Sequence, residues 1–165
     1  MEIEQIYKNV DNLVLTHLMV NDEAMKIMQS LGYNGFKRLH RYNTKCLLCY
    51  HHQLENYFYD RYQRVLNTRV DFTSYNPLDL KSHLEKWKSL LESSIQELSE
   101  LNQEHFDVVG VTNYVIEDLI CDFVKHLEKV NRWIIRFNES LWSSIDCHMV
   151  DDCLHAKMKK KEEGE

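Results

Sequence analysis

Apolar residues recur at steps of three and four along most of this chain, which is the pattern of helices that bury one face. Polar and charged residues fill the positions between them. We therefore expect long amphipathic helices over residues 3–28, 35–65, 77–106 and 113–137. The predicted fold class is all-α, with a core formed by the apolar faces of these four helices.

The connections between these stretches predict how the helices are arranged. Residues 31–35 hold two glycines and an asparagine, which suit a tight reversal, so the first two helices should be antiparallel. Residues 67–76 are polar and favour an extended chain of about 33 Å, roughly the length of a 22-residue helix. We expect this segment to cross the bundle, with the third helix parallel to the second.

Local residues indicate where the later helices begin and end. Asn76 is expected to cap the third helix, with Pro77 in its first position. A turn at residues 108–110 should separate the third helix from the fourth, which Thr112 or Asn113 can cap. The expected architecture is a four-helix bundle with one long crossover.

The C-terminal part continues the helical pattern beyond the bundle. Leu141, Trp142, Ile145 and Met149 keep helical spacing, which predicts an extension of the fourth helix or a fifth short helix. We expect a bundle over residues 1–150, followed by a helical extension and charged tail over residues 151–165. The last residues, 157–165, are expected to be solvated and frayed.

Composition narrows the class of protein. The chain of 165 residues has only four Gly and one Pro, which favours long helices over strands and turns. A net charge of −6 disfavours nucleic acid as a partner, and no apolar run is long enough to span a membrane. Five cysteines in no compact pattern predict reduced thiols, and hence a cytoplasmic protein.

Two segments carry a resemblance to a known family. GYNGFKRLHRYN, residues 32–43, resembles the first turn and the opening of the second helix in some ferritins. The segment from Leu90 to Ile134 resembles the third and fourth helices of ferritins in spacing and texture. The resemblance implies a ferritin-like bundle that binds iron or another divalent metal, for oxidation or storage, and that forms a homo-oligomer.

The sequence departs from that family at the metal ligands. Ferritins and their di-iron relatives carry Glu-x-x-His on the second helix, and this pattern does not occur here. When Gly35 is aligned with the glycine of the ferritin turn, the positions of that Glu and His fall at Leu47 and Tyr50. A standard di-iron centre is therefore not expected, and none of the family's ligands is carried over.

Other residues could still bind a metal ion. His51 and Glu55 form an i, i+4 pair on the second helix, where a hydrogen bond or ion pair is the alternative. On the fourth helix, Asp118, Asp122 and His126 follow at successive i, i+4 steps, where solvated surface charges are the alternative.

His17 lies on the apolar seam of the first helix, where it is either a metal ligand or a hydrogen-bonded core residue. It could meet Asp122 or His126 if the first and fourth helices face each other.

The densest candidate metal site lies near the C-terminus. His148, Asp152 and His155 have i, i+4, i+7 spacing and could converge on a cation, with Asp151 beside them. A polar cap or a contact between subunits is the alternative interpretation.

Two functions from different classes remain open. The first is a divergent ferritin-like protein that binds iron or another divalent metal through His17, Glu55, Asp118, Asp122, His126, His148, Asp152 or His155. The second is a non-catalytic bundle that has lost the metal site and acts as a structural or interaction protein. Its interface would be the aromatic face of residues 35–65 and the C-terminal helix. No phosphate-binding loop or nucleophile motif supports another enzyme class.

Overall fold

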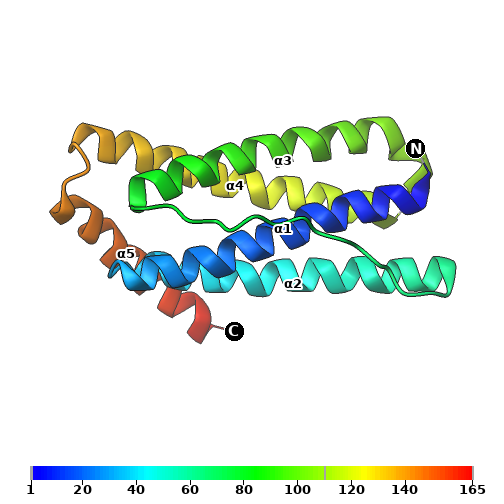
Figure 1. Cartoon of the computed structure of the whole chain (residues 1–165), viewed down its shortest axis with the longest axis horizontal. Coiled ribbons are helices and arrows are strands. Elements are labelled where there is room, and N and C mark those ends of the chain that lie inside the picture. The colour runs from blue at the N-terminus through cyan, green and yellow to red at the C-terminus, as the bar shows by residue number, and fades with distance from the viewer. Residues whose placement is uncertain (1, 110, 165) are drawn as a thin grey trace.

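The protein is an elongated bundle of helices (Figure 1). The structure, a computed structural model, describes residues 2–109 and 111–164, with side chains described outside residues 103–113. Helices account for most of these residues. They are α1 (Ile3–Ser30), α2 (Asn34–Tyr62), α3 (Leu80–Val109), α4 (Val111–Glu139) and α5 (Ser144–Glu163). Within the described part of the chain there is no strand, and no helix is long and apolar enough to cross a bilayer.

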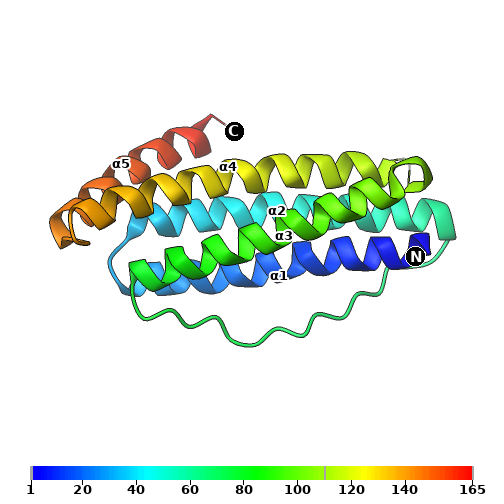
Figure 2. The same cartoon turned by 90° about the horizontal axis from the view of Figure 1, so that it is seen from above.

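The connectivity is the one predicted from the sequence. Helices α1 and α2 form an antiparallel pair, and the segment 63–79 then returns along the whole length of the bundle (Figure 2). Helix α3 therefore runs parallel to α2, and α4 runs back beside α3. The crossover is held to α1, because Asn12 Nδ2 donates to the carbonyl oxygen of Arg69 at 2.8 Å and Glu23 accepts from the backbone N–H of Tyr75 at 2.8 Å.

The start of α3 differs from the prediction. Asn76 and Pro77 lie in the crossover, and the helix begins at Leu80. Asp79 Oδ1 accepts from the backbone N–H of Ser82 at 2.7 Å, and Ser82 Oγ accepts from the backbone N–H of Asp79 at 3.2 Å. This reciprocal arrangement satisfies two N–H groups at the helix start, which a cap at Asn76 alone would not do. Helix α3 also continues beyond residue 106, and the turn residue Gly110 lies outside the described residues.

Helix α1 ends in a turn that only its glycine fits without strain. Gly32 has a φ of 84°, in the left-handed region. The backbone N–H of Tyr33 donates to the carbonyl oxygen of Met28 at 2.8 Å, and that of Gly32 donates to Gln29 at 3.2 Å. These two bonds form a Schellman motif, which closes α1 and starts the reversal into α2.

Helix α4 ends in the same motif without a glycine. Leu141 and Trp142 have φ values of 54° and 56°, and the backbone N–H of Trp142 donates to the carbonyl oxygen of Phe137 at 2.7 Å. Because this turn stops the helix, α5 is a separate fifth helix rather than an extension of α4. Ser143 caps α5 by accepting from the backbone N–H of Asp146 at 3.2 Å.

Helix α5 crosses one end of the bundle and packs on the start of α2 (Figures 1 and 2). A Cβ atom at Gly35 would lie 2.0 Å from the carbonyl oxygen of Asp151, so the two helices cross in close backbone contact. Asp151 Oδ1 accepts from the backbone N–H of Phe36 at 2.9 Å and so caps α2. Residue 150, where we expected the bundle to end and the extension to begin, lies inside this helix.

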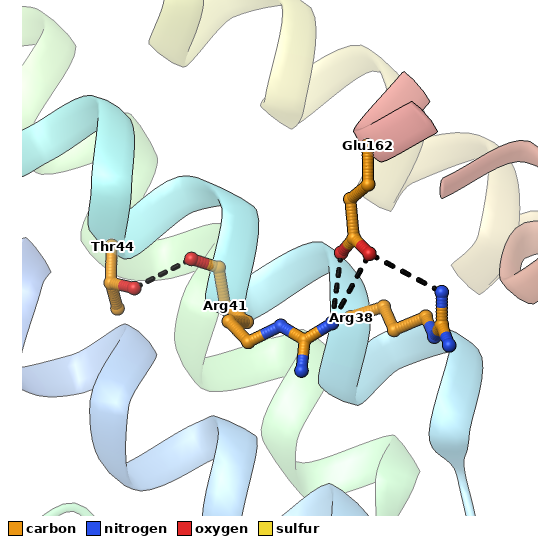
Figure 3. Close-up of polar contacts among 4 residues, drawn as sticks. All are labelled: Arg38, Arg41, Thr44 and Glu162. Carbon is orange, nitrogen blue, oxygen red and sulfur yellow. Dashed lines mark hydrogen bonds and ion pairs between the residues drawn. The ribbon is translucent and has the colours of Figure 1, made fainter. Parts of the chain in front are cut away.

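The charged C-terminal segment is not frayed, contrary to expectation. It is helical to Glu163, and Met158 is buried. Near its end, the Glu162 carboxylate accepts from Arg41 Nη2 at 3.1 Å and 3.2 Å and from Arg38 Nη1 at 3.3 Å (Figure 3). These contacts hold the end of α5 against α2, which explains why the segment stays ordered as helix.

Candidate functional site

Two buried histidines, His40 near the start of α2 and His83 near the start of α3, belong to a chain of hydrogen bonds. His40 Nδ1 lies 2.7 Å from Asn21 Oδ1, and His40 Nε2 lies 2.8 Å from His83 Nε2. His83 Nδ1 lies 2.6 Å from the phenol oxygen of Tyr75 in the crossover. Asn21 Nδ2 donates to the carbonyl oxygen of His17, which fixes its Oδ1 as the acceptor for His40.

These contacts determine the protonation of both rings. Burial lowers the pKa of His83 to about 3 and that of His40 well below its usual range, so both are neutral at pH 7. Since His40 must donate from Nδ1 to the amide oxygen, its Nε2 accepts from His83 Nε2–H. His83 Nδ1 then accepts from Tyr75. All four ring nitrogens are used, so we call Tyr75, His83, His40 and Asn21 the histidine network.

His17 lies in the core beside this network. Its Nε2 is 2.8 Å from Ser94 Oγ in α3, and its ring stacks on Phe123 of α4 with a centroid distance of 4.3 Å. Burial, followed by the influence of His126, lowers the pKa of His17 to about 3. The imidazole is therefore neutral, as expected of a hydrogen-bonded core residue.

A cavity of about 210 Å³ lies between the helices next to His17. We call it the central cavity. It is lined by His17, Asn21, Tyr42, Asn43, Cys46, Leu47, Tyr50, Trp87, Asp122, Phe123, Lys125, His126, Lys129 and Lys161. On its wall the phenol of Tyr50 donates to Asp122 Oδ2 at 2.5 Å. Burial and the contact with Asp122 raise the pKa of Tyr50, so its hydroxyl keeps the proton that it donates.

His126 is the second imidazole on the cavity wall. Burial is the main cause that lowers its pKa to about 4, with Asp122 acting in the opposite direction and Lys129 and Lys161 lowering it further. The cavity therefore contains two neutral imidazoles, His17 and His126, and one carboxylate, Asp122, at pH 7. The hypothesis that His17 would come near Asp122 or His126 is consistent with this placement.

The other candidates on α4 and α2 lie elsewhere. Asp118 is exposed and does not line the cavity. Glu55 contacts two histidines of its own helix, because its Oε1 is hydrogen-bonded to His52 Nδ1 at 3.0 Å and lies 3.2 Å from His51 Nε2. His51 also contacts the buried Asp11 of α1 at 2.6 Å. The arrangement at Glu55 is the hydrogen-bonded alternative considered above.

The candidates in α5 lie in different surroundings. His148 stacks on Tyr33 with a centroid distance of 4.6 Å, and Asp152 is exposed. His155 is half-buried, and its backbone lies close to Gly35. Asp151 acts as the cap of α2 rather than as a ligand. The spacing of these residues is helical, but the structure gives each of them a different environment.

The arrangement does not fit a di-iron centre. Among the described side chains, no group of three or more His, Cys, Asp or Glu residues could hold a metal ion. Such a centre needs several carboxylates in the bundle core, and Asp122 is the one carboxylate among the described residues that line the cavity. Leu47 and Tyr50, the positions at which the resemblance places the second-helix Glu and His, both lie on the cavity wall.

The histidine network was not predicted from the sequence. Helical spacing places His40 and Asn43 on the face of α2 that holds Leu47, and His83 on the face of α3 that holds Trp87. This helical spacing predicts that these residues are buried. The contact of His83 with Tyr75 depends on the path of the crossover, which no local sequence pattern specifies.

The aromatic residues of α2 and the five cysteines were also considered in the sequence, and the structure shows where they lie. Of the aromatic residues expected to form an interface on α2, only Tyr59 is exposed, while Phe58 and Tyr62 pack with Tyr7 of α1. This face is therefore used mainly within the chain. All five cysteines are free, and Cys46 lines the cavity.

Comparison with known proteins supports the fold but not a function. No protein-family model matches the chain, and no curated protein matches it in sequence. Among solved structures, the chain is similar to a ferritin from the multicellular green alga Ulva pertusa. The TM-score is 0.73 at 14% sequence identity, over 94% of this chain and 84% of that one. The chain therefore has a ferritin-like fold, a four-helix bundle with a short C-terminal helix.

Proposed function

We propose that this protein is a non-catalytic ferritin-like bundle, in which the histidine network and the central cavity take the place of a di-iron centre. The observation that supports this most strongly is the directed chain from Tyr75 through His83 and His40 to Asn21. A ring nitrogen that already donates or accepts a buried hydrogen bond has no lone pair free for a metal. Breaking such a bond costs about 1–3 kcal/mol.

The cavity wall supports the same proposal. Leu47 provides no ligand atom, and the phenol of Tyr50 is engaged with Asp122. The raised pKa of Tyr50, which follows from its burial, opposes the phenolate form that a metal would need. The protein would act through binding at its cavity or its surface, rather than through oxidation of iron.

A second candidate function is the binding of a single divalent ion by His17, Asp122 and His126 after a rearrangement, because no described group of three such side chains could hold a metal ion as placed. These three residues line one cavity, and both imidazoles are neutral, which is the form that coordinates metals. Binding would require His17 to leave Ser94 and Asp122 to leave Tyr50. The same experiment distinguishes the two candidates.

The test is metal content and iron oxidation of the untagged protein. Elemental analysis before and after anaerobic addition of Fe(II), followed by air, should show no stoichiometric metal and no oxidation beyond that of free iron. One metal per chain that disappears in an Asp122→Asn, His126→Gln variant would select the second candidate. Two irons per chain with rapid oxidation would contradict both.

We also propose that the chain forms a homo-oligomer in the cytoplasm. Free cysteines suit a reducing compartment. Leu141, Ile145 and Met149 are exposed around the α4–α5 turn, at 88%, 78% and 56%, and apolar groups of this kind often contact a partner. Light scattering after size exclusion should give a mass above one chain. A concentration-independent mass of one chain would contradict this part of the proposal.

A further inference from the structure

Three lysines surround the exposed side of the central cavity. Lys125 and Lys129 come from α4, and Lys161 comes from α5. All three are exposed, and none of them forms an ion pair with a described carboxylate. Lys161 Nζ instead lies over the ring of Tyr42, 4.3 Å from its centroid. Among the described side chains, the cavity is thus bordered by three cations that are not paired with a carboxylate.

The lysines at this border lie close enough together to influence one another. The pKa of Lys129 is lowered, first by burial and then by the neighbouring charges of Lys161, Arg132 and Lys157. In a protein with a net charge of −6, this concentration of cations is not a general property of the surface.

Acidic groups nearby do not neutralise these lysines. Asp122 faces the cavity, and its carboxylate accepts from Tyr50. Glu162 follows Lys161 in α5, and its carboxylate is taken by Arg41 and Arg38 (Figure 3). With His17 and His126 neutral, three lysines and one carboxylate leave the lining of the cavity positive.

The interior of the cavity is suited to a flat apolar group. Phe123, Trp87 and Leu47 contribute apolar surface. A cavity of about 150 Å³ is known to accept benzene, so about 210 Å³ has room for a ring with a small substituent. Trp87 is 1% exposed, and its indole Nε1 has no hydrogen-bond partner among the described residues.

We propose that the central cavity binds a small organic anion, with a flat apolar body among Trp87, Phe123 and Leu47 and a negatively charged group at Lys125, Lys129 and Lys161. This inference deepens the proposed function, and it rests on the cavity being free of a metal. A carboxylate and a phosphate on a ring would both fit this description, because each is an anionic oxygen group. The experiment below distinguishes between them.

The test is a titration of the chelator-treated protein with benzoate, phenyl phosphate, and the uncharged analogue benzamide, at low ionic strength. We expect saturable binding of at least one anion, at least about tenfold tighter than benzamide, and weakening as salt is added. In ¹⁵N-labelled protein, the indole N–H signal of Trp87 should shift on binding. That of Trp142, whose Nε1 donates to Asn138 Oδ1, should stay in place.

Variants locate the site. Lys129→Gln together with Lys161→Gln should weaken binding of the anion about tenfold and leave benzamide unaffected. The matched control is Lys159→Gln with Lys160→Gln, which removes the same charge from exposed positions of α5 that do not line the cavity. Circular dichroism confirms that both variants fold.

Several results would overturn the inference. They are no saturable binding of either anion, equal binding of benzamide, or equal losses in the two lysine variants. Metal found in the protein before chelation would contradict the proposed function, while anion binding after chelation would still support this inference. Failure of the proposed function can therefore be told apart from failure of the anion-binding inference.

Discussion

The phenol of Tyr50 in α2 donates to Asp122 Oδ2 in α4 at 2.5 Å, across the central cavity. This contact joins the α1–α2 pair to the α3–α4 pair in the middle of the bundle. Because a carboxylate acceptor strengthens a hydrogen bond, the contact both stabilises the bundle and keeps Asp122 from other roles. The wall of the cavity is therefore set by a bond between side chains rather than by apolar packing alone.

Replacing Tyr50 with Phe should destabilise the protein by about 1–3 kcal/mol, because Asp122 loses its partner while the ring remains in place. Urea unfolding followed by circular dichroism measures the change. Tyr59→Phe is the matched control, since Tyr59 is 50% exposed on the same helix. Equal stability of the two variants would mean that the Tyr50 bond adds nothing to the fold.

Gly35→Ala should disturb the contact between α2 and α5. The added Cβ would meet the carbonyl oxygen of Asp151 and the backbone nitrogen of His155 at 2.0 Å and 2.8 Å, and backbone atoms can move away only if α5 shifts. We expect a loss of about 1–3 kcal/mol and faster hydrogen exchange throughout α5.

Gly164→Ala is the control for this substitution, because its Cβ would meet nothing closer than 3.5 Å. If Gly35→Ala exchanges hydrogen in α5 at the rate of the natural protein, the close crossing of these helices is not needed.

The sequence was sufficient to predict the helices and their connectivity, because both depend on local patterns. Apolar spacing marks the buried faces, and the glycines at 32 and 35 mark the reversal. The polar segment before Pro77 was long enough to cross the bundle. The start of α3 was placed too early, since the Asp79–Ser82 pair competes with Asn76 as the cap.

The site was less predictable because it depends on contacts between distant segments. Helical spacing placed His17, Asp122 and His126 on or beside the apolar faces of their helices, and the cavity that they line depends on how α1 and α4 meet across the core. The bond between His83 and Tyr75 requires the crossover to lie against α3. Likewise, helical spacing alone could not tell whether His148 binds a metal or stacks on Tyr33.

Stability should fall as the pH is lowered from about 6.5 towards 4, below the usual pKa of histidine. Burial holds the pKa of His17 and His83 at about 3 and that of His126 at about 4, whereas in the unfolded chain they take up protons near 6.5. In this window the unfolded state binds more protons. The stability that depends on these neutral, buried rings is fully present above pH 6.5. It is lost as the pH falls towards the pKa values that the histidines have in the folded protein.

Urea unfolding at pH 7.5, 6 and 5 measures this dependence. Each of these histidines adds at most about 1.4 kcal/mol per pH unit to the slope, so His126→Gln should reduce the slope by up to that amount. A free energy of unfolding that is constant between pH 6.5 and 5 would contradict the neutral burial of these rings.

Glu162→Gln should loosen the end of α5 with little effect on the whole protein. The carboxylate is partly exposed and contacts Arg41 and Arg38, so its contribution is below about 1 kcal/mol and should weaken in salt. Hydrogen exchange of the last turns of α5 should speed up in the variant, and the unfolding midpoint should barely move. Unchanged exchange there would show that the contacts of Glu162 with Arg38 and Arg41 do not hold this end of α5.

The proposed metal-free core is tested most directly by a side-chain ¹⁵N spectrum of the histidines, recorded at pH 7.5 and about 5.5 and after addition of Zn²⁺. We expect His17, His40, His83 and His126 to stay neutral, with the proton on Nδ1 of His40 and on Nε2 of His83, and Zn²⁺ to leave them unchanged. Protonation of the His40–His83 pair at pH 5.5, or a joint shift of His17 and His126 with one equivalent of Zn²⁺, would contradict it.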